Sequence, residues 1–110
     1  MLNIDRELFQ WEKDRYVLID FPGQITHVQF YNDRTKEGPE IAVINGTALI
    51  PNYLLKEPLP IIALGYIKTK YDTKIVCRKT FRVLRRARPQ SYIDDSSEVR
   101  EIIYDGGVEV

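Results

Sequence analysis

Hydrophobic and polar positions alternate in several segments of this chain with the period of two that is typical of β-strands. In the segment 73–84, the apolar residues on one parity are Ile75, Cys77, Phe81 and Val83. Since successive side chains of a strand point to opposite faces, this spacing predicts that the apolar set faces a core. Lys79 interrupts the row, as expected where a strand bulges or where its end opens to solvent.

The preceding segment, 61–67, is a continuous apolar run that follows Pro58 and Pro60. A run of this length is typical of a strand covered on both faces, and it is short for a helix. Tyr71 and Asp72 stand at the expected reversal between the two segments. Together the segments predict one long β-hairpin, and the rest of the chain is arranged to cover it.

Shorter strands and turns are predicted before the hairpin. The expected extended segments are 2–4, 8–11, 16–20, 26–32, 40–44 and 47–50. Pro22-Gly23 marks a turn, and Asn45-Gly46 predicts a two-residue hairpin in which 47–50 pairs back on 40–44. Pro51 is well placed to begin one helical turn, because proline is tolerated at a first helical position.

About seven short strands with frequent turn signals predict an all-β, immunoglobulin-like antiparallel sandwich with one short helical turn near 51–55. A small closed barrel would produce a similar pattern, which does not fix the strand order. The chain has 110 residues, of which 44% are hydrophobic, so it is long enough for one domain with a real core. We expect the sandwich at 1–93 with Trp11 as a core anchor, and an acidic tail or linker at 94–110.

The formal net charge is zero, but the charges are segregated along the chain. Residues 68–88 carry nine basic side chains against one acid, and residues 94–110 carry six acids against one arginine. A solvated basic strand edge, which discourages edge-to-edge pairing, is the simplest interpretation. An anionic partner and the acidic tail of a neighbouring copy are the alternatives.

Residues suited to catalysis or metal binding are sparse. His27 is the only histidine and Cys77 the only cysteine, which leaves no basis for a thiolate zinc site, a disulfide or a catalytic triad. We interpret His27 as a surface strand residue and Cys77 as a buried, inert thiol. The glycines are dispersed, and Asp94-Asp95 lies in the expected tail, where solvated carboxylates stay ordinary acids. We therefore expect no enzyme activity, no cofactor and no metal.

Two other classes of partner follow from the apolar and basic segments. No apolar run approaches the roughly 20 residues of a membrane helix, so no membrane partner is expected. A small β-barrel that presents the basic strand 74–88 to single-stranded nucleic acid is an alternative function, with Tyr66, Tyr71 and Phe81 as stacking candidates. The inward parity of Phe81 and the zero net charge weigh against it.

An ordered set of short motifs extends over residues 1–99. These motifs are Phe9-Gln10-Trp11-Glu12, Ile25-Thr26-His27-Val28-Gln29-Phe30, Ile50-Pro51-Asn52-Tyr53-Leu54-Leu55, Lys79-Thr80-Phe81-Arg82-Val83 and Ala87-Arg88-Pro89-Gln90-Ser91-Tyr92-Ile93. The set resembles the N-terminal immunoglobulin-like domain of the baseplate upper proteins of phages and prophages from Gram-positive hosts. Gln90-Ser91 departs from that family, which often has a small residue and Asp before the tyrosine. Relatives also continue into further domains, so we expect a small stand-alone member or the N-terminal piece of a longer protein.

The resemblance implies a structural, non-enzymatic protein of a phage or prophage tail or baseplate. Such a protein is made in the bacterial cytoplasm and is located in the virion, where the domain is a rigid adaptor for protein–protein assembly. Expected partners are other tail or baseplate proteins or further copies of the chain, and not nucleic acid. The expected partner-binding residues are Arg85, Arg86, Arg88 and Tyr92. As a hypothesis, the arginines dock the protein's own acidic tail or an acidic patch on a partner, while Tyr92 and Pro89 lock the outgoing chain against the domain.

Overall fold

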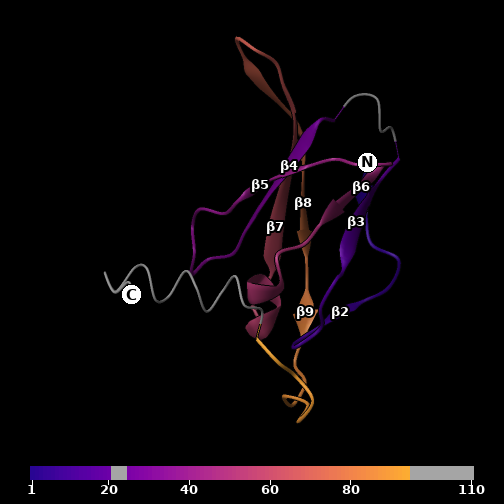
Figure 1. Cartoon of the computed structure of the whole chain (residues 1–110). Helices are drawn as coiled ribbons and strands as arrows, with labels where there is room; N and C mark the ends of the chain where they lie inside the picture. The colour runs from indigo at the N-terminus through magenta and orange to yellow at the C-terminus, as the bar shows by residue number, and fades with distance from the viewer. Residues whose placement is uncertain (21–24, 95–110) are drawn as a thin grey trace, which may run out of the picture.

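The computed structural model describes residues 1–20 and 25–94, and these residues form an all-β sandwich with one short helical turn, as predicted (Figure 1). The strands are β1 (Leu2–Asn3), β2 (Leu8–Phe9), β3 (Tyr16–Ile19), β4 (His27–Tyr31), β5 (Glu40–Ala42), β6 (Thr47–Leu49), β7 (Ile61–Lys68), β8 (Thr73–Phe81) and β9 (Val83–Leu84). The turn is a 3-10 helix, η1 (Asn52–Lys56), which begins directly after Pro51. Within 1–20 and 25–94, no helix is long and apolar enough to cross a membrane. The predicted turn at Pro22-Gly23 and the tail beyond Asp94 lie outside the described residues.

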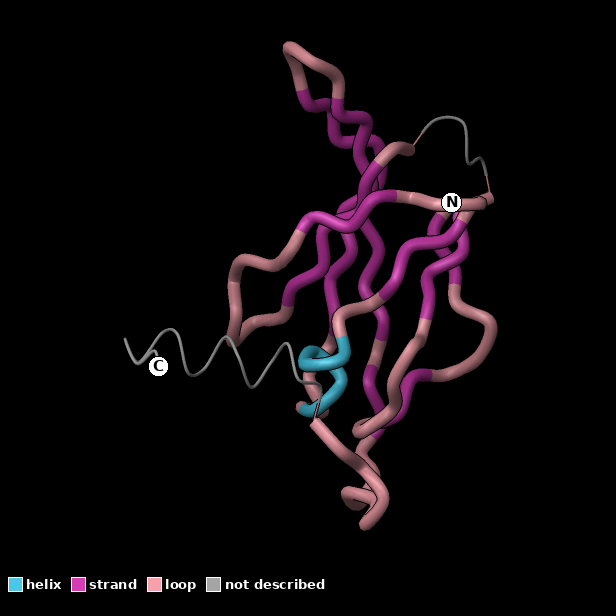
Figure 2. The backbone as a smooth tube through the Cα atoms, viewed as in Figure 1, coloured by secondary structure: helices cyan, strands magenta, loops and turns pink. Residues whose placement is uncertain are grey.

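Two antiparallel sheets form the layers of the sandwich (Figure 2). One sheet has the strand order β5-β4-β7-β8, and the other has the order β1-β3-β6. The short strands β2 and β9 form a separate parallel pair, which the sequence did not predict. This pair joins the N-terminal segment to the chain that leaves the hairpin, at the lower end of the molecule in Figure 1.

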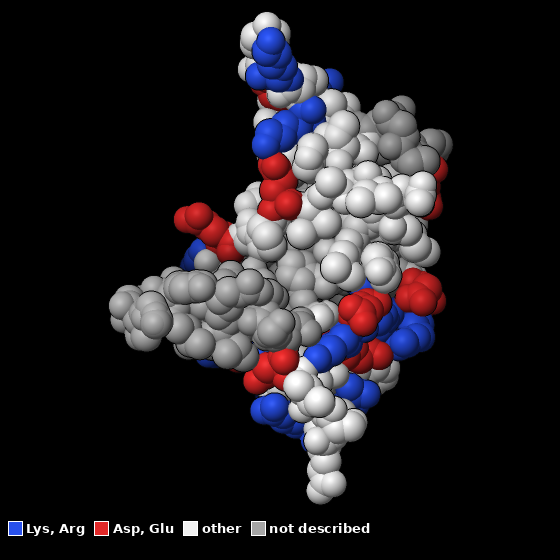
Figure 3. All heavy atoms as spheres, viewed as in Figure 1, with Lys and Arg blue, Asp and Glu red and all other residues white. Residues whose placement is uncertain are grey.

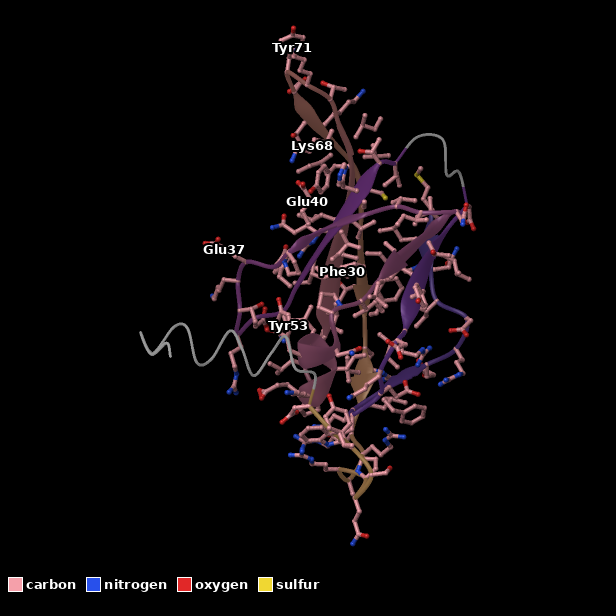
Figure 4. All side chains as sticks on the ribbon, in the orientation of Figure 1. Phe30, Glu37, Glu40, Tyr53, Lys68 and Tyr71 are labelled. Atoms are coloured by element: carbon pink, nitrogen blue, oxygen red, sulfur yellow. The ribbon has the colours of Figure 1, made fainter. Side chains whose placement is uncertain are left out.

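Alternating side chains from both sheets fill the space between the layers. In β3 the buried residues are Val17 and Ile19, and in β4 they are Val28 and Phe30, with the intervening residues more exposed. Phe30 is completely buried and lies between the two sheets in Figure 4. Burial of one such side chain stabilises the fold by roughly 1.5–3 kcal/mol, so the period-two pattern accounts for the core directly.

The turn at Asn45-Gly46 forms as predicted, but the strands that it joins do not pair as a hairpin. Both residues have positive φ, 53° and 74°, as a type I′ turn requires. A single isolated bridge, between Ile44 and Thr47, connects the two arms. Beyond the bridge, β5 pairs with β4 and β6 pairs with β3, so the turn carries the chain from one sheet to the other.

The strands β7 and β8 form the predicted long hairpin, whose tip projects beyond the body of the sandwich (Figure 1). Phe81 and the following Val83 are buried, as the alternation predicted. The prediction for Ile75 is wrong, because its side chain is 62% exposed. Gly65 pairs with Cys77, whereas the next residue, Tyr66, pairs with Ile75, so Val76 is an extra residue in β8.

This β-bulge reverses the alternation along β8 and lies nearer the hairpin tip than Lys79. Lys79 pairs with Ala63 in regular register and is exposed on the outer strand of the sheet. Cys77 is half-buried, not buried as expected. A Cβ atom on Gly65 would lie 3.0 Å from the Cys77 Sγ and 3.0 Å from the Ile25 Cδ1, so the glycine permits a close approach of these side chains.

The bulge leads to a direct comparison of two apolar residues on the same strand. We expect Phe81→Ala to lower the free energy of unfolding by about 3–5 kcal/mol, because it empties a buried site. Ile75→Ala should change it by less than about 0.5 kcal/mol, because the side chain already lies in water. Urea unfolding of both variants measures the difference, and equal losses would contradict the register described for β8.

Candidate partner-binding surface

The chain that leaves the hairpin is held against the N-terminal segment at the lower end of the molecule. After the parallel pairing of β2 with β9, the Gln10 amide donates to the Leu84 carbonyl at 2.9 Å. The Arg86 amide donates to the Gln10 Oε1 at 3.1 Å, and the Arg86 Nε donates to the Gln10 carbonyl at 2.8 Å. One of the expected partner-binding arginines therefore fixes the exit segment as well as carrying a surface charge.

Aromatic and cationic side chains stack next to this connection. The rings of Trp11 and Tyr92 meet edge to face with centroids 5.2 Å apart. The Arg88 guanidinium lies 5.1 Å from the Trp11 ring centroid and 5.4 Å from that of Tyr92. Lys13 Nζ lies 4.7 Å from the Tyr92 ring centroid and donates to the Ile93 carbonyl. We call Trp11, Lys13, Arg86, Arg88 and Tyr92 the basal cluster.

The basal cluster gives the exit segment a defined position on the domain. An aromatic pair of this geometry contributes about 0.5–1.5 kcal/mol beyond its buried area, and an exposed cation–π contact contributes about 0.5–1 kcal/mol. Pro89, Ser91 and Ile93 line a shallow pocket together with members of the cluster. Tyr92 is half-buried in these contacts, whereas Arg86 and Arg88 remain exposed.

Trp11 is half-buried in this cluster and does not belong to the core between the sheets, so the prediction that it anchors the core is wrong. Its backbone has a φ of 69°, which is unusual for a bulky residue. The Trp11 amide donates to the Leu55 carbonyl at 2.9 Å, and the Gln10 Nε2 donates to the Lys56 carbonyl at 2.9 Å. The 3-10 helix η1 therefore holds the turn that presents the tryptophan to the exit segment.

A buried arginine supports the loop that carries Trp11 and Lys13. Arg15 is 5% exposed, and its guanidinium donates to the Asp5 carboxylate at 3.0 Å and also to the Glu12 carboxylate. It further donates to the backbone carbonyls of Arg6 and Glu7. The sequence Glu12-Lys13-Asp14-Arg15 indicates only a charged turn here, and no periodic signal indicates which of these neighbouring charges is buried.

The two carboxylates of this network are more acidic than usual. The hydrogen bond from Arg15 lowers the pKa of Asp5. Burial raises the pKa of Glu12, but hydrogen bonds from Arg6, the Phe9 amide and Arg15 outweigh it and leave that pKa below its ordinary value. Both groups therefore favour the folded state at neutral pH, where they are charged.

Arg85, Arg86, Arg88 and Tyr92, the expected partner-binding residues, all lie at the lower end, but they have different surroundings. Arg85 is exposed, and its side chain has no hydrogen bond or ion pair among residues 1–20 and 25–94. The predicted docking of the acidic tail on the arginines lies largely outside the described residues. Asp94, the described member of that tail, pairs with Lys56 at 2.8 Å, and this hydrogen bond lowers the pKa of Asp94.

Charged and uncharged side chains are separated on the face seen in Figure 3. Charged side chains gather at the lower end and on the projecting hairpin, and uncharged surface covers much of the area between them. Part of the uncharged surface of the molecule comes from the outer face of β3 and β6, where Tyr16, Leu18 and Leu49 are 39–46% exposed. Exposed apolar surface of this kind commonly marks protein contacts, and the outward parity of Tyr16 and Leu18 was its sequence signal.

The residues considered for chemistry are not brought together. His27 is half-buried on β4, where its ring stacks on Tyr66 with centroids 5.8 Å apart. The Tyr66 hydroxyl donates to Glu40, and Lys68 Nζ donates to Glu40 at 2.7 Å (Figure 4). Burial and the bond to Glu40 raise the pKa of Tyr66, and the bonds from Lys68 and Tyr66 lower that of Glu40. Within the described chain, no three His, Cys, Asp or Glu side chains gather as metal ligands.

The aromatics named for nucleic-acid stacking occupy different environments. Phe81 and Tyr66 are 5% and 6% exposed, so their rings offer little face to a base. Tyr71, at the tip of the hairpin, is 88% exposed (Figure 4). Single-strand binding surfaces present several exposed rings along one groove, and these three residues do not form such a row.

Substitution of the buried arginine should show how the network depends on pH. We expect Arg15→Gln to cost about 1–3 kcal/mol at neutral pH, because it removes the guanidinium that bonds Glu12, Asp5 and two backbone carbonyls, although Glu12 keeps its bond to Arg6. Because the native pKa values of Asp5 and Glu12 are lowered, their stabilisation is present above the unfolded-state values near 4 and is lost as the pH falls through the native values. Denaturant unfolding across this range should therefore show a smaller acid-induced loss in Arg15→Gln than in the unaltered protein. The exposed Arg78→Gln serves as the control, and an equal acid-induced loss in Arg15→Gln would contradict the assignment.

The sole tryptophan gives a direct measure of the basal cluster. Replacement of Tyr92 or Arg88 by alanine should increase the quenching of Trp11 fluorescence by acrylamide, because each change uncovers part of the indole ring. Arg78→Ala, on β8, should leave the quenching unchanged. If Tyr92→Ala and Arg78→Ala quench equally, the exit segment does not pack on Trp11 in solution.

Comparison with known proteins identifies no relative of this chain. No family model, no curated protein and no solved structure matches the chain. The functional proposals below therefore depend on the motifs of the sequence and on the geometry of the described residues.

Proposed function

We propose that this chain is a structural, non-enzymatic component of a phage or prophage tail or baseplate, in which the sandwich is a rigid adaptor between protein neighbours. The particle type comes from the resemblance of the ordered motifs over residues 1–99. The observation that carries the adaptor role is the fixed course of the exit segment across the basal cluster, next to the exposed Arg85 side chain, which has no hydrogen bond or ion pair with the residues that the structure describes.

A rigid exit suits an adaptor because it sets the direction in which the chain leaves the domain. The parallel pair β2–β9, the two hydrogen bonds between Arg86 and Gln10, and the packing of Tyr92 on Trp11 act in succession along the segment. The ion pair between Lys56 and Asp94 then fixes the last described residue against η1. A neighbour bound at this end would be held in a defined orientation relative to the sandwich.

The arginines favour an acidic surface as the partner at this end. Arg85 offers its full hydrogen-bonding capacity to a carboxylate, and the exposed guanidinium of Arg88 remains accessible beside the aromatic rings. Exposed ion pairs contribute only about 0–1 kcal/mol each, so these contacts would orient the partner more than they would tighten its binding. Apolar contacts, such as those available on the outer face of β3 and β6, would supply additional affinity.

Charge reversal at Arg85 tests the proposal, because this arginine contributes least to the fold among the expected partner-binding residues. We expect Arg85→Glu to reduce co-purification of the protein with the tail or baseplate proteins encoded beside it, while its circular dichroism spectrum and unfolding midpoint stay unchanged. Adding Arg88→Glu should reduce co-purification further, at some cost in stability because Arg88 stacks on Trp11.

Lys70→Glu is the matched control, since it makes the same change of charge at the hairpin tip. It should leave co-purification intact. Normal assembly of Arg85→Glu and of the double variant would refute the role of this surface. A gene neighbourhood without any tail, holin or lysin gene would count against the particle itself.

A further inference from the structure

The outer face of the sheet β1-β3-β6 is apolar at positions where an antiparallel sandwich usually presents polar side chains to water. Tyr16 and Leu18 point outward from β3, and Tyr16 pairs with Leu49 on the neighbouring strand β6. These three side chains are 39–46% exposed, although the residues between them on the same strands are buried. The larger sheet differs, because one outward row across it includes Glu40 and Arg78, which are both exposed.

A groove adjoins this apolar face on the side of β5. The arms of the Asn45-Gly46 turn diverge after the bridge between Ile44 and Thr47, and β5 and β6 enter different sheets (Figure 2). The groove between the two strands has a volume of about 380 Å³, and most of its lining is apolar, including Tyr16, Ile44 and Leu49. The apolar face and the groove therefore form one continuous surface, with Tyr16 and Leu49 common to both.

The chemistry of this surface restricts what can cover it. Among the described residues that line the groove, only Glu40 is charged, and its carboxylate already accepts hydrogen bonds from Tyr66 and Lys68. A charged group of a partner placed here would lose its water without gaining an ion pair. The occupant must therefore present an uncharged, apolar surface of its own.

A second copy of the chain presents such a surface, and the shape of the surface is complementary to itself. Tyr16 lines both the groove and a second hollow that Leu18 and Thr47 also line, so its ring forms a ridge between two depressions. When two identical surfaces meet about a twofold axis, the ridge of each can enter the groove of the other. Asp5 and Arg6 line the second hollow as well, so this border carries both signs of charge and does not repel its own copy.

We propose that two copies of the chain associate face to face through the outer surface of β3 and β6, with Tyr16 of each copy in the groove between β5 and β6 of the other. Ile44, which lines this groove and is 67% exposed, would be covered in the pair. The largest apolar patch of a single domain measures on the order of 300–600 Å², less than the roughly 800 Å² that each partner buries in a standard interface. We therefore expect a reversible pair with a dissociation constant on the order of 10–1,000 µM.

Pairing deepens the proposed adaptor function, and its role in assembly rests on that function. Exposed ion pairs at the basal arginines contribute little affinity each, but a pair of copies presents two such sets, and two linked weak contacts bind more tightly than one. Arg85 lines neither the groove nor the second hollow. The contact between copies and the contact with an acidic partner can therefore be separated by mutation.

Sedimentation equilibrium of the full chain tests the pairing. The mean molecular mass should rise from that of a monomer toward that of a dimer as the concentration increases to about 1 mM. Ile44→Glu should raise the dissociation constant at least about tenfold, because it places a charge in an apolar contact. Ile75→Glu is the matched control, since Ile75 is 62% exposed on β8 and receives the same change, and it should leave the dissociation constant unaltered.

Contacts between copies can also be observed without a substitution. In an equal mixture of isotope-labelled and unlabelled protein, filtered nuclear Overhauser effects should connect the Tyr16 ring of one copy to the Ile44 methyl groups of the other. A protein that self-associates without these effects pairs through another surface, which would overturn the proposed geometry.

The remaining outcomes separate pairing from the adaptor function. A chain that stays monomeric up to about 1 mM, or an Ile44→Glu variant that associates as strongly as Ile75→Glu, would overturn the pairing. If the chain is monomeric and Ile44→Glu loses co-purification with tail proteins, a different protein covers this face and the second copy is excluded. Arg85→Glu should leave self-association unchanged, so loss of the basal partner and loss of pairing are distinct results.

Discussion

Water is excluded from the space between the two sheets by side chains that point inward from alternate positions of short strands. Phe30, Val28 and Val17 are completely buried there, and each strand is too short to be stable without this contact. The requirement that both layers cover one another fixes the other features of the molecule. It places the long hairpin with its first half in the core and its tip in solvent, and it leaves β8 as an outer strand.

The lower end of the sandwich shows how a small domain controls the direction of its exit. The pair β2–β9 is parallel, which requires the N-terminal segment and the chain after the hairpin to run side by side. Arg15 is buried under the connecting loop and donates hydrogen bonds to the carboxylates of Asp5 and Glu12, and η1 receives the hydrogen bonds of the turn at Trp11. The aromatic rings and the arginines of the basal cluster are therefore positioned by contacts far apart in the sequence.

The basic side chains of the chain lie on two separate parts of the molecule. Basic side chains on the hairpin and near the exit lie in one stretch of the sequence, but the fold separates them into the β8 edge and the basal cluster. At the basal cluster, some cations already contact aromatic rings or backbone carbonyls, so their main effect there is to orient the exit segment on the domain.

The sequence by itself determined the local features of this protein. Alternation in 27–31 and 73–84 indicated strands, Asn45-Gly46 indicated a turn with positive φ, and Pro51 indicated a helical turn, because each depends on backbone sterics within a few residues. The same local signals placed Arg85, Arg86 and Arg88 on the surface.

Only the tertiary structure decided which segments meet. The arms of the Asn45-Gly46 turn enter different sheets, where β5 pairs with β4 and β6 pairs with β3. The bulge at Val76 turns Ile75 into solvent, the N-terminal turn brings Trp11 to Tyr92, and Arg15 is buried among backbone carbonyls. These outcomes depend on competition between partners far apart in the chain, and a period of two contains no information about which partner prevails.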